Sequence, residues 1–336
     1  MTTIRVNRVW VFLLTVAVSA LGFGSSASAG GWAVSTLDEV LQYEADHGDD
    51  NDLAGGSARS EAIEVYLYSA AMRRARDSIK QGQPISGWLI RSAHKHLLRH
   101  GRGTETAPGE FKTKQNYLAD KMKRAVLFTP ISPERLQDGM EKLFEYIDND
   151  MHELLIRTAV SHVEFEALHP FDDGNGRIGR MLIPLILWKH GALSEPYFYL
   201  SAYFEKHRDE YIDRMRNVSA ADSWTDWIKF FLESVQAEAG ASLAKAEEIR
   251  ALYESMKQKF RDSLSSKWSI SVLDLAFSSP IFRSVDLTKQ ARIPPQSAPR
   301  LAKILVEEGI LKIIRLPSGR RPALYAFEPL LKLIRG

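Results

Sequence analysis

Apolar side chains recur at helical intervals through the middle of the chain. Over Met151–Leu168 they return three and four positions apart, which is the spacing of one helix face. A second apolar stretch, Met181–Trp188, predicts another helix that begins near Gly176. Pro170 argues against one continuous helix, because a proline disfavours helical backbone in the residue before it. The pattern therefore predicts two helices joined by a short connection.

The last third of the chain combines a charged helical stretch with a smaller patterned region. Residues 237–268 mix charged and apolar positions in a way that predicts a linker helix. Asp286 is expected to cap a later helix, and Gly309 to end another. Three short helices and a β-hairpin are predicted, over Val272–Phe277, Val285–Ala291, Ser297–Glu308, and Ile310–Arg315 with Ala323–Phe327. This order predicts a winged helix-turn-helix over residues 269–336.

Composition and charge narrow the class of protein only a little. With 336 residues, of which 45% are hydrophobic, the chain has room for two domains with sizeable cores. The net charge of +2 gives no bulk attraction to nucleic acid. The chain has no cysteine, which excludes disulfides and thiolate metal sites.

The connection between the two middle helices, His169–Arg180, is dense in chemical groups and reads HPFDDGNGRIGR. Its glycines let the backbone approach a ligand closely, and N–H groups at a helix start attract anions. Arg177 and Arg180 lie three positions apart, so both guanidinium groups can bind phosphate on one side of the helix. Asp173 is an oxygen ligand suited to Mg²⁺, and His169 can accept a proton. These residues predict a site that holds a polyphosphate beside a base.

A zinc site is the alternative interpretation of the same region. His162, Glu166 and His169 are spaced at i, i+4 and i+7, which could gather a metal ion. That interpretation leaves the glycines and both arginines unexplained. We therefore favour the phosphate site and expect His162 to be a packed helix residue.

The string His169–Arg180 resembles the pattern of the Fic (Fido) family, His-x-Phe-x-Asp/Glu-Gly-Asn-Gly-Arg-x-x-Arg, at every fixed position. The resemblance extends from about residue 86 to residue 235. Pro108–Tyr117 is similar to the family's Pro-Gly-x-Phe-Arg-x-x-x-Asn segment, and Tyr199–Phe204 is similar to the start of its closing helices.

The resemblance implies an all-α fold, a Fic helical bundle with a small β-hairpin flap. We expect the Fic (Fido) domain over residues 85–236, with an N-terminal helical region over residues 30–84 before it. The linker helix (237–268) and the winged helix-turn-helix domain (269–336) would follow.

The resemblance also implies an activity, the transfer of AMP from Mg-ATP to a Ser, Thr or Tyr hydroxyl of a target protein or of the enzyme itself. His169 would be the base and Asp173 would hold Mg²⁺. The rest of the motif would bind the ATP phosphates, through Gly174, Asn175, Gly176, Arg177 and Arg180. Asn175 would contact the α-phosphate, and the two arginines the β- and γ-phosphates in turn. Relatives also use other nucleotides or phosphocholine, but Asp173 and Arg180 favour a triphosphate donor.

Two further sites are implied by the resemblance. The strand Val126, Leu127 and Phe128 would belong to the flap and align a target segment by strand addition. Tyr199 and Tyr203 could line the adenine pocket, although aromatic residues at that spacing also suit a core.

Regulation is expected to differ from that of many Fic proteins. These carry an upstream Ser-x-x-x-Glu-Gly helix whose glutamate pairs with the second motif arginine and blocks the γ-phosphate. In the matching register Gly31 stands at the glutamate position, and Ser57–Ala62 offers Glu61 as a second candidate. We therefore expect the blocking glutamate to be missing and Arg180 to be free.

The winged region suggests DNA as a partner. Five basic residues of its third helix and hairpin could contact phosphates, namely Arg300, Lys303, Arg315, Arg320 and Arg321. The alternative function is therefore a DNA-binding transcriptional regulator whose Fic core senses nucleotide without transferring it. A homodimer is a further expected partner.

The first 29 residues have a pattern of their own. Arg5 and Arg8 precede an apolar run over residues 9–24, and small residues ending at Ala29 follow. This order is typical of a signal peptide, and the run is short for a membrane span. We nevertheless expect a cytoplasmic protein with a mis-started segment, because ATP and Mg²⁺ are abundant in the cytosol. Export or anchoring through residues 1–29 is the alternative.

Overall fold

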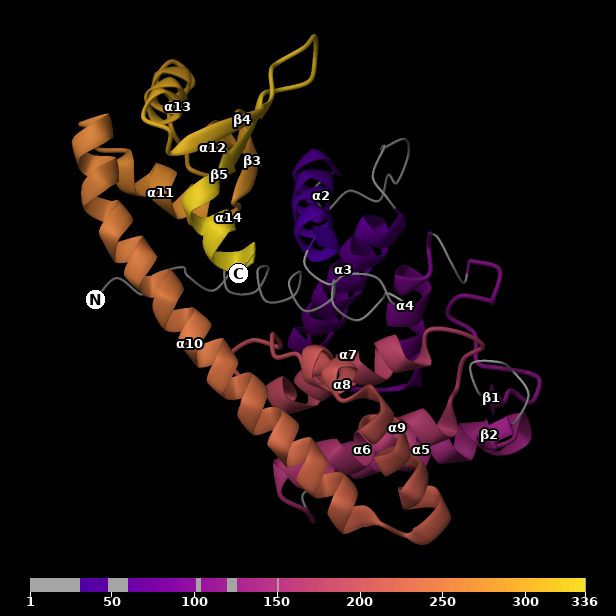
Figure 1. Cartoon of the computed structure of the whole chain (residues 1–336). Helices are drawn as coiled ribbons and strands as arrows, with labels where there is room; N and C mark the ends of the chain where they lie inside the picture. The colour runs from indigo at the N-terminus through magenta and orange to yellow at the C-terminus, as the bar shows by residue number, and fades with distance from the viewer. Residues whose placement is uncertain (1–30, 48–59, 101–103, 120–125, 150, 336) are drawn as a thin grey trace. The chain divides into compact units, whose positions relative to one another are not determined.

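The computed structural model describes residues 31–47, 60–100, 104–119, 126–149 and 151–335. The chain divides into two compact units, of which one comprises residues 63–239 and the other residues 1–62 with 240–336 (Figure 1). The signal-like segment 1–29 lies outside the described residues. None of the helices in the described ranges has the length and apolar content that a membrane crossing needs.

The unit of residues 63–239 is a helical bundle. Its helices are α3 (Ser60–Lys80), α4 (Gly87–Leu97), α5 (Pro133–Asp148), α6 (Leu154–Leu168), α7 (Asn175–Lys189), α8 (Ser201–Lys206), α9 (Arg208–Ala221) and the first part of α10 (Trp224–Leu264). The two middle helices predicted from the apolar spacing are α6 and α7. Trp227 of α10 is fully buried against them, and its indole N–H donates to the Ala159 carbonyl at 2.9 Å. This core holds the ends of α6 and α7 in place.

A two-stranded antiparallel sheet, β1 (Leu118–Ala119) with β2 (Val126–Phe128), forms the expected flap. Leu118 pairs with Phe128. Val126 is 58% exposed, which is unusual for a large apolar residue in a strand. The side chain of Leu127 lies outside the described residues.

The second unit contains the helices and the hairpin expected for a winged helix-turn-helix. Its elements are α2 (Gly31–His47), the rest of α10, α11 (Ser269–Ser278), β3 (Ile281–Arg283), α12 (Asp286–Lys289), α13 (Ala298–Glu307), β4 (Leu311–Arg315), β5 (Leu324–Phe327) and α14 (Glu328–Arg335). The three strands form one antiparallel sheet in the order β3-β5-β4. The strand β3 was not predicted, because three residues are too few to show an alternation of apolar and polar side chains.

Two predicted features of this unit differ from the structure. Asp286 does not cap its helix, since its buried carboxylate accepts hydrogen bonds from the backbone N–H and the guanidinium of Arg283 at 2.8 and 3.2 Å. The linker helix is not a separate element, because α10 runs without interruption for 41 residues (Figure 1). The last bundle helix and the predicted linker are therefore one helix.

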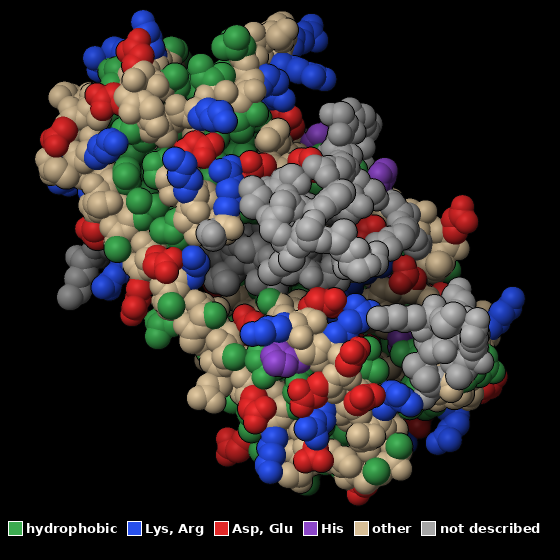
Figure 2. Space-filling view, viewed as in Figure 1, with side chains coloured by type: hydrophobic (Ala, Val, Ile, Leu, Met, Phe, Trp, Pro, Cys, Tyr) green, Lys and Arg blue, Asp and Glu red, His purple; other side chains and the backbone are tan. Residues whose placement is uncertain are grey.

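The five basic residues expected to contact DNA fall into two groups. Arg315 is bound by α2, since its guanidinium donates to both carboxylate oxygens of Asp46 at 2.7 and 2.8 Å. The others are exposed, and they are Arg300 and Lys303 on α13 with Arg320 and Arg321 in the loop between β4 and β5. Figure 2 shows Lys and Arg side chains gathered over this loop.

Candidate functional site

His169 lies at the point where α6 ends. It adopts the left-handed conformation with φ of 47°, which costs energy for a residue that carries a side chain. Its Nδ1 lies 3.4 Å from the Glu166 carbonyl, so we assign the proton to Nδ1 and leave Nε2 as the acceptor. Burial, followed by the nearby Lys112 ammonium, lowers the pKa of His169 to about 4. The imidazole is therefore neutral at physiological pH, as a base must be.

The loop after His169 is fixed by Phe171. The ring of Phe171 is fully buried and stacks on the His94 ring, with centroids 3.7 Å apart and an interplanar angle of 6°. His94 in turn accepts from the Gly109 N–H at Nδ1 and bonds the Asp173 carbonyl through Nε2, both at 2.8 Å. Phe171 thus anchors the loop to the core of the bundle.

Gly174 opens α7 and must be a glycine on two counts. Its φ is +82°, a conformation that L side chains rarely adopt. A Cβ there would also lie 3.2 Å from His94 Nε2. The start of α7 can therefore lie directly against the buried His94. The first backbone N–H groups of α7 are available to bind an anion there.

Asn175 differs from the expectation that its side chain contacts the α-phosphate. Its side-chain amide is buried and binds both backbone groups of Phe171. The amide oxygen accepts from the Phe171 N–H at 2.8 Å, and the amide nitrogen donates to the Phe171 carbonyl at 2.7 Å. The structure gives this side chain a role in shaping the loop.

The first motif arginine is already paired with carboxylates. Arg177 is buried and donates to Asp173 at 3.2 Å. Its other terminal nitrogen lies 3.8 Å from a carboxylate oxygen of Glu64, a buried residue of α3. A phosphate that binds Arg177 must therefore compete with Glu64.

The second motif arginine has different surroundings. Arg180 leans back over Gly176, so that a Cβ on this glycine would lie 3.0 Å from a guanidinium nitrogen. Glu166 lies behind the same helix, and burial raises the pKa of its carboxyl to about 7. Among the described residues, no carboxylate lies within salt-bridge distance of Arg180. Arg180 is therefore the less neutralised of the two cations.

Glu64 was missed in the sequence, where Gly31 and Glu61 were considered instead. Gly31 begins α2, and the side chain of Glu61 lies outside the described residues. The signal that could have found Glu64 is Ser60-x-x-x-Glu64, which has the spacing of the family's inhibitory helix with Val65 in place of its glycine. Glu64 lies 3.8 Å from Arg177, the first motif arginine, so the expectation that Arg180 is free of a blocking glutamate stays a prediction.

The zinc interpretation is not supported by the structure. Both ring nitrogens of the buried His162 are engaged, with the Gly179 carbonyl at 3.2 Å and the Tyr211 hydroxyl at 2.8 Å. Within the described ranges, no group of three or more His, Asp or Glu side chains could hold a metal ion. His162 is a packed helix residue.

The buried His162 predicts a loss of stability in acid. Burial lowers its pKa to about 3 from an ordinary 6.5, so the unfolded chain binds more protons between these values. The contribution of His162 to the free energy of unfolding is complete above pH 6.5. It falls as the pH drops, by about 1 kcal/mol at pH 5.5. In His162→Gln, urea unfolding should show a smaller decrease in free energy between pH 7 and 5.5 than in the wild type. An equal decrease would contradict this assignment.

Magnesium fits the partly exposed carboxylate of Asp173. Mg²⁺ is commonly bound by one or two carboxylates together with substrate phosphates. The Asp173 side chain is 45% exposed, with one oxygen accepting from the Gly174 N–H at 2.7 Å. It can therefore still offer an oxygen to a cation beside Arg177.

The predicted adenine residues pack with other aromatic rings. Tyr203 stacks on His207 with centroids 4.3 Å apart and meets Phe230 edge-on at 5.7 Å. Tyr199 is buried, 6.3 Å from the ring of Tyr68. The structure thus gives both residues core contacts, which was the second interpretation of their spacing.

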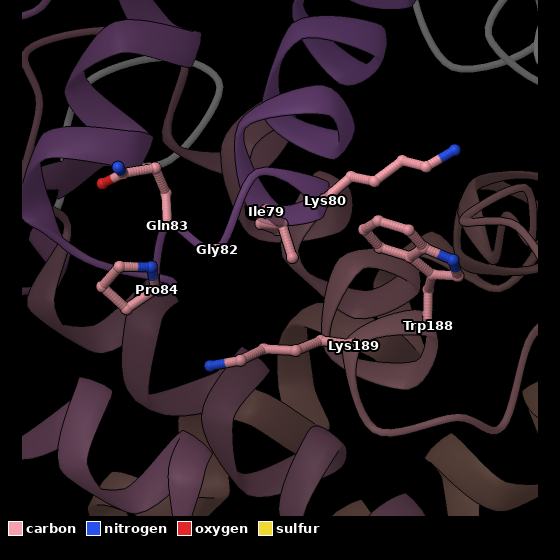
Figure 3. Close-up of a pocket in the computed structure, with 7 residues that line it drawn as sticks. All are labelled: Ile79, Lys80, Gly82, Gln83, Pro84, Trp188 and Lys189. Carbon is pink, nitrogen blue, oxygen red and sulfur yellow. The ribbon is translucent and has the colours of Figure 1, made fainter.

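A cavity of about 490 Å³ lies at the other end of α7 (Figure 3). It is lined by residues from the ends of α3 and α7, namely Ile79, Lys80, Gly82, Gln83, Pro84, Trp188 and Lys189. An α-helix rises about 1.5 Å per residue, so this cavity is about 20 Å from the motif along α7. It is distinct from the motif site.

Comparison with known proteins agrees with the motif. Residues 84–187 match the Fic/DOC family. The chain is similar to protein adenylyltransferase fic-1 of Caenorhabditis elegans, at 32% identity over 142 residues, and the match covers 40% of this chain and 26% of that protein. It is also similar to a uridine 5'-monophosphate transferase of Xanthomonas campestris, at 36% identity over 72 residues, covering 19% of this chain and 13% of that protein.

A solved structure extends the comparison to the fold. A Fic family protein from Desulfovibrio desulfuricans G20 superposes with a TM-score of 0.53 at 18% identity, covering 96% of this chain and 86% of that one. The chain spans about a quarter of the length of the first curated relatives that it matches, 26% in each case. The chain therefore carries a domain of the Fic/DOC family, over residues 84–187.

Proposed function

We propose that this protein transfers AMP from Mg-ATP to a hydroxyl side chain of a target protein. The observation that carries the proposal is the neutral imidazole of His169 beside the start of α7, where Arg177 and Arg180 follow within two turns. A base, helix N–H groups and two guanidinium groups are the parts that a phosphoryl-type transfer needs.

The reaction needs one proton transfer and one displacement. The target hydroxyl gives its proton to His169 Nε2, and its oxygen forms a bond to the α-phosphorus. The bond from the α-phosphorus to the bridging oxygen breaks, and pyrophosphate leaves with its electron pair. Arg177 and Arg180 bind the leaving group and stabilise its charge.

Asp173 is the residue that would hold Mg²⁺. The ion supplies neutralisation of the phosphate charge when it is bound. Asp173 keeps its orientation through the Gly174 N–H and through Arg177, at 2.7 and 3.2 Å.

The relatives differ in the nucleotide that they transfer, so the base of the donor must be chosen between adenine and uracil. One relative is named a uridine 5'-monophosphate transferase, whereas the relative that matches over more of this chain is named a protein adenylyltransferase. We propose ATP, because the match to the protein adenylyltransferase extends over 142 residues and the match to the uridine 5'-monophosphate transferase over 72. Initial rates with ATP and UTP compare the two donors, and a higher kcat/KM with UTP would overturn the choice.

The target is proposed to dock at the flap. A groove of about 340 Å³ lies between β2 and α9, lined by Val126, Phe128, Thr129, Arg216, Asn217, Ser219 and Ala220. Exposed apolar residues beside a short strand suit an extended segment of another protein. We infer a cytoplasmic location, because the cytosol supplies ATP and Mg²⁺.

The proposed function is tested with ATP labelled at different phosphates. Purified protein is incubated with Mg²⁺ and ATP labelled at the α-phosphate, and in parallel with ATP labelled at the γ-phosphate. Label on protein is expected from the α position only, with equimolar pyrophosphate released. Label from the γ position would indicate a kinase and would contradict the proposal.

DNA binding is the second candidate function, favoured by the exposed basic residues Arg300, Lys303, Arg320 and Arg321 of the winged region. Phosphate contacts dominate affinity for DNA and depend on such cations. If the wing binds DNA, Arg320→Ala combined with Arg321→Ala should abolish a gel shift seen with the wild type. An unchanged shift would remove the wing from this second proposal.

A further inference from the structure

Two side chains from another part of the chain bind the backbone around His169. The Lys112 ammonium donates to the Leu168 carbonyl at 3.1 Å and to Asn116 Oδ1 at 2.8 Å. The Asn116 amide donates to the carbonyls of His169 and Phe171, both at 3.1 Å.

The backbone N–H of Lys112 completes the set. It donates to the Pro170 carbonyl at 2.8 Å. Two residues therefore satisfy four successive carbonyls, those of residues 168 to 171, across a separation of more than 50 positions along the chain. The carbonyls at a helix end have no partners within the helix, so they need donors from elsewhere.

The buried ammonium is costly to the fold. Lys112 is only 4% exposed, and burial lowers its pKa to about 8. In the described ranges, no carboxylate lies within salt-bridge distance of it. A cation at the C-terminal end of a helix is favourable, which offsets part of this cost. Such a residue persists where it holds a backbone conformation that would otherwise relax.

We propose that Lys112 and Asn116 are positioning residues that hold His169 in its left-handed conformation, with its imidazole turned toward the reacting hydroxyl. The inference rests on the proposed function for its effect on rate. In this proposal the segment 108–116 orients the catalytic base and does not bind the nucleotide.

The geometry separates two kinetic effects. Neither Lys112 nor Asn116 forms a hydrogen bond with Asp173, Arg177 or Arg180. Phosphate binding should therefore be unchanged when either residue is replaced. A displaced base lowers the rate of the chemical step, and a shift of about 1 Å can cost about 100-fold. The expected signature is a lower kcat with an unchanged KM for ATP.

The test compares Lys112→Met, Asn116→Ala and Lys112→Arg with the wild type and with Lys142→Met. Lys142 is an exposed lysine of α5 whose ammonium lies 2.8 Å from the Asp138 carboxylate. The first two variants should lose about 10- to 100-fold in kcat and change KM for ATP by less than about twofold. Lys112→Arg should recover most of the loss, since a guanidinium keeps the charge and the donors.

Three results would overturn the proposal. One is a raised KM with unchanged kcat in Lys112→Met, and another is a Lys112→Arg variant as impaired as Lys112→Met. The third is an equal loss in Lys142→Met.

Amide hydrogen exchange separates this inference from the proposed function. Residues 168–175 should exchange at least about tenfold faster in Lys112→Met than in Lys142→Met, whether or not AMP is transferred. Equal exchange would overturn the positioning role. A wild-type protein that transfers no AMP but shows this difference would overturn the proposed function alone.

Discussion

Replacing His169 by alanine should reduce AMP transfer by about 10²- to 10⁴-fold, the range that a lost general base costs. Its Nε2 is the acceptor because Nδ1 faces the Glu166 carbonyl at 3.4 Å. The buried His94 and His162 cannot take its place, since both ring nitrogens of each are engaged. The measurement is the initial rate of α-labelled transfer at saturating Mg-ATP.

The matched control for this variant is His152→Ala. His152 is an exposed histidine whose Nδ1 lies 3.0 Å from the Tyr146 hydroxyl. Its variant should transfer AMP at the wild-type rate. ATP binding by His169→Ala, measured by calorimetry, should also be close to that of the wild type. A rate within twofold of the wild type in His169→Ala would show that His169 is not the base.

Replacing Glu64 by glutamine should increase AMP transfer at low ATP, with KM for ATP falling about tenfold. The carboxylate of Glu64 lies 3.8 Å from Arg177 in a buried position, where it would compete with a bound phosphate for this guanidinium. A tenfold change corresponds to about 1.4 kcal/mol, a modest value for a partly shielded pair of charges. Glutamine keeps the shape of the side chain and removes only its charge.

Glu141→Gln provides the control for this charge change. Glu141 is exposed on α5 and accepts from Gln137 at 2.6 Å, away from the motif. It should leave KM for ATP unchanged. If Glu64→Gln bound ATP no better than Glu141→Gln, the competition at Arg177 would be excluded as a brake on activity.

The motif region could be predicted because its signals are local. The ends of α6 and α7 follow from the apolar spacing, from Pro170 and from the glycines between them. His169, Asp173 and the two arginines lie within twelve residues, so a single string places them together. In the structure these residues follow one another from the end of α6 into α7, and His169 has left-handed backbone.

The supporting residues could not be predicted, because their partners are distant in sequence. Lys112 reaches Leu168 across 56 positions, and no periodicity links the two. Glu64 was overlooked because the spacing pattern fits several registers between residues 28 and 64. Arg315 was expected to be available to DNA, but its binding by Asp46 depends on a contact across 269 positions. Long-range packing, and not local propensity, decides such contacts.

The central claim is that His169 drives the attachment of AMP to protein. Intact-mass spectrometry tests it most directly, on Glu64→Gln protein incubated with Mg-ATP, compared with the double variant Glu64→Gln, His169→Ala. The first protein should gain the mass of one or more AMP groups, and the second should gain none. An AMP adduct on both proteins, or a mass gain of a single phosphate, would contradict the account.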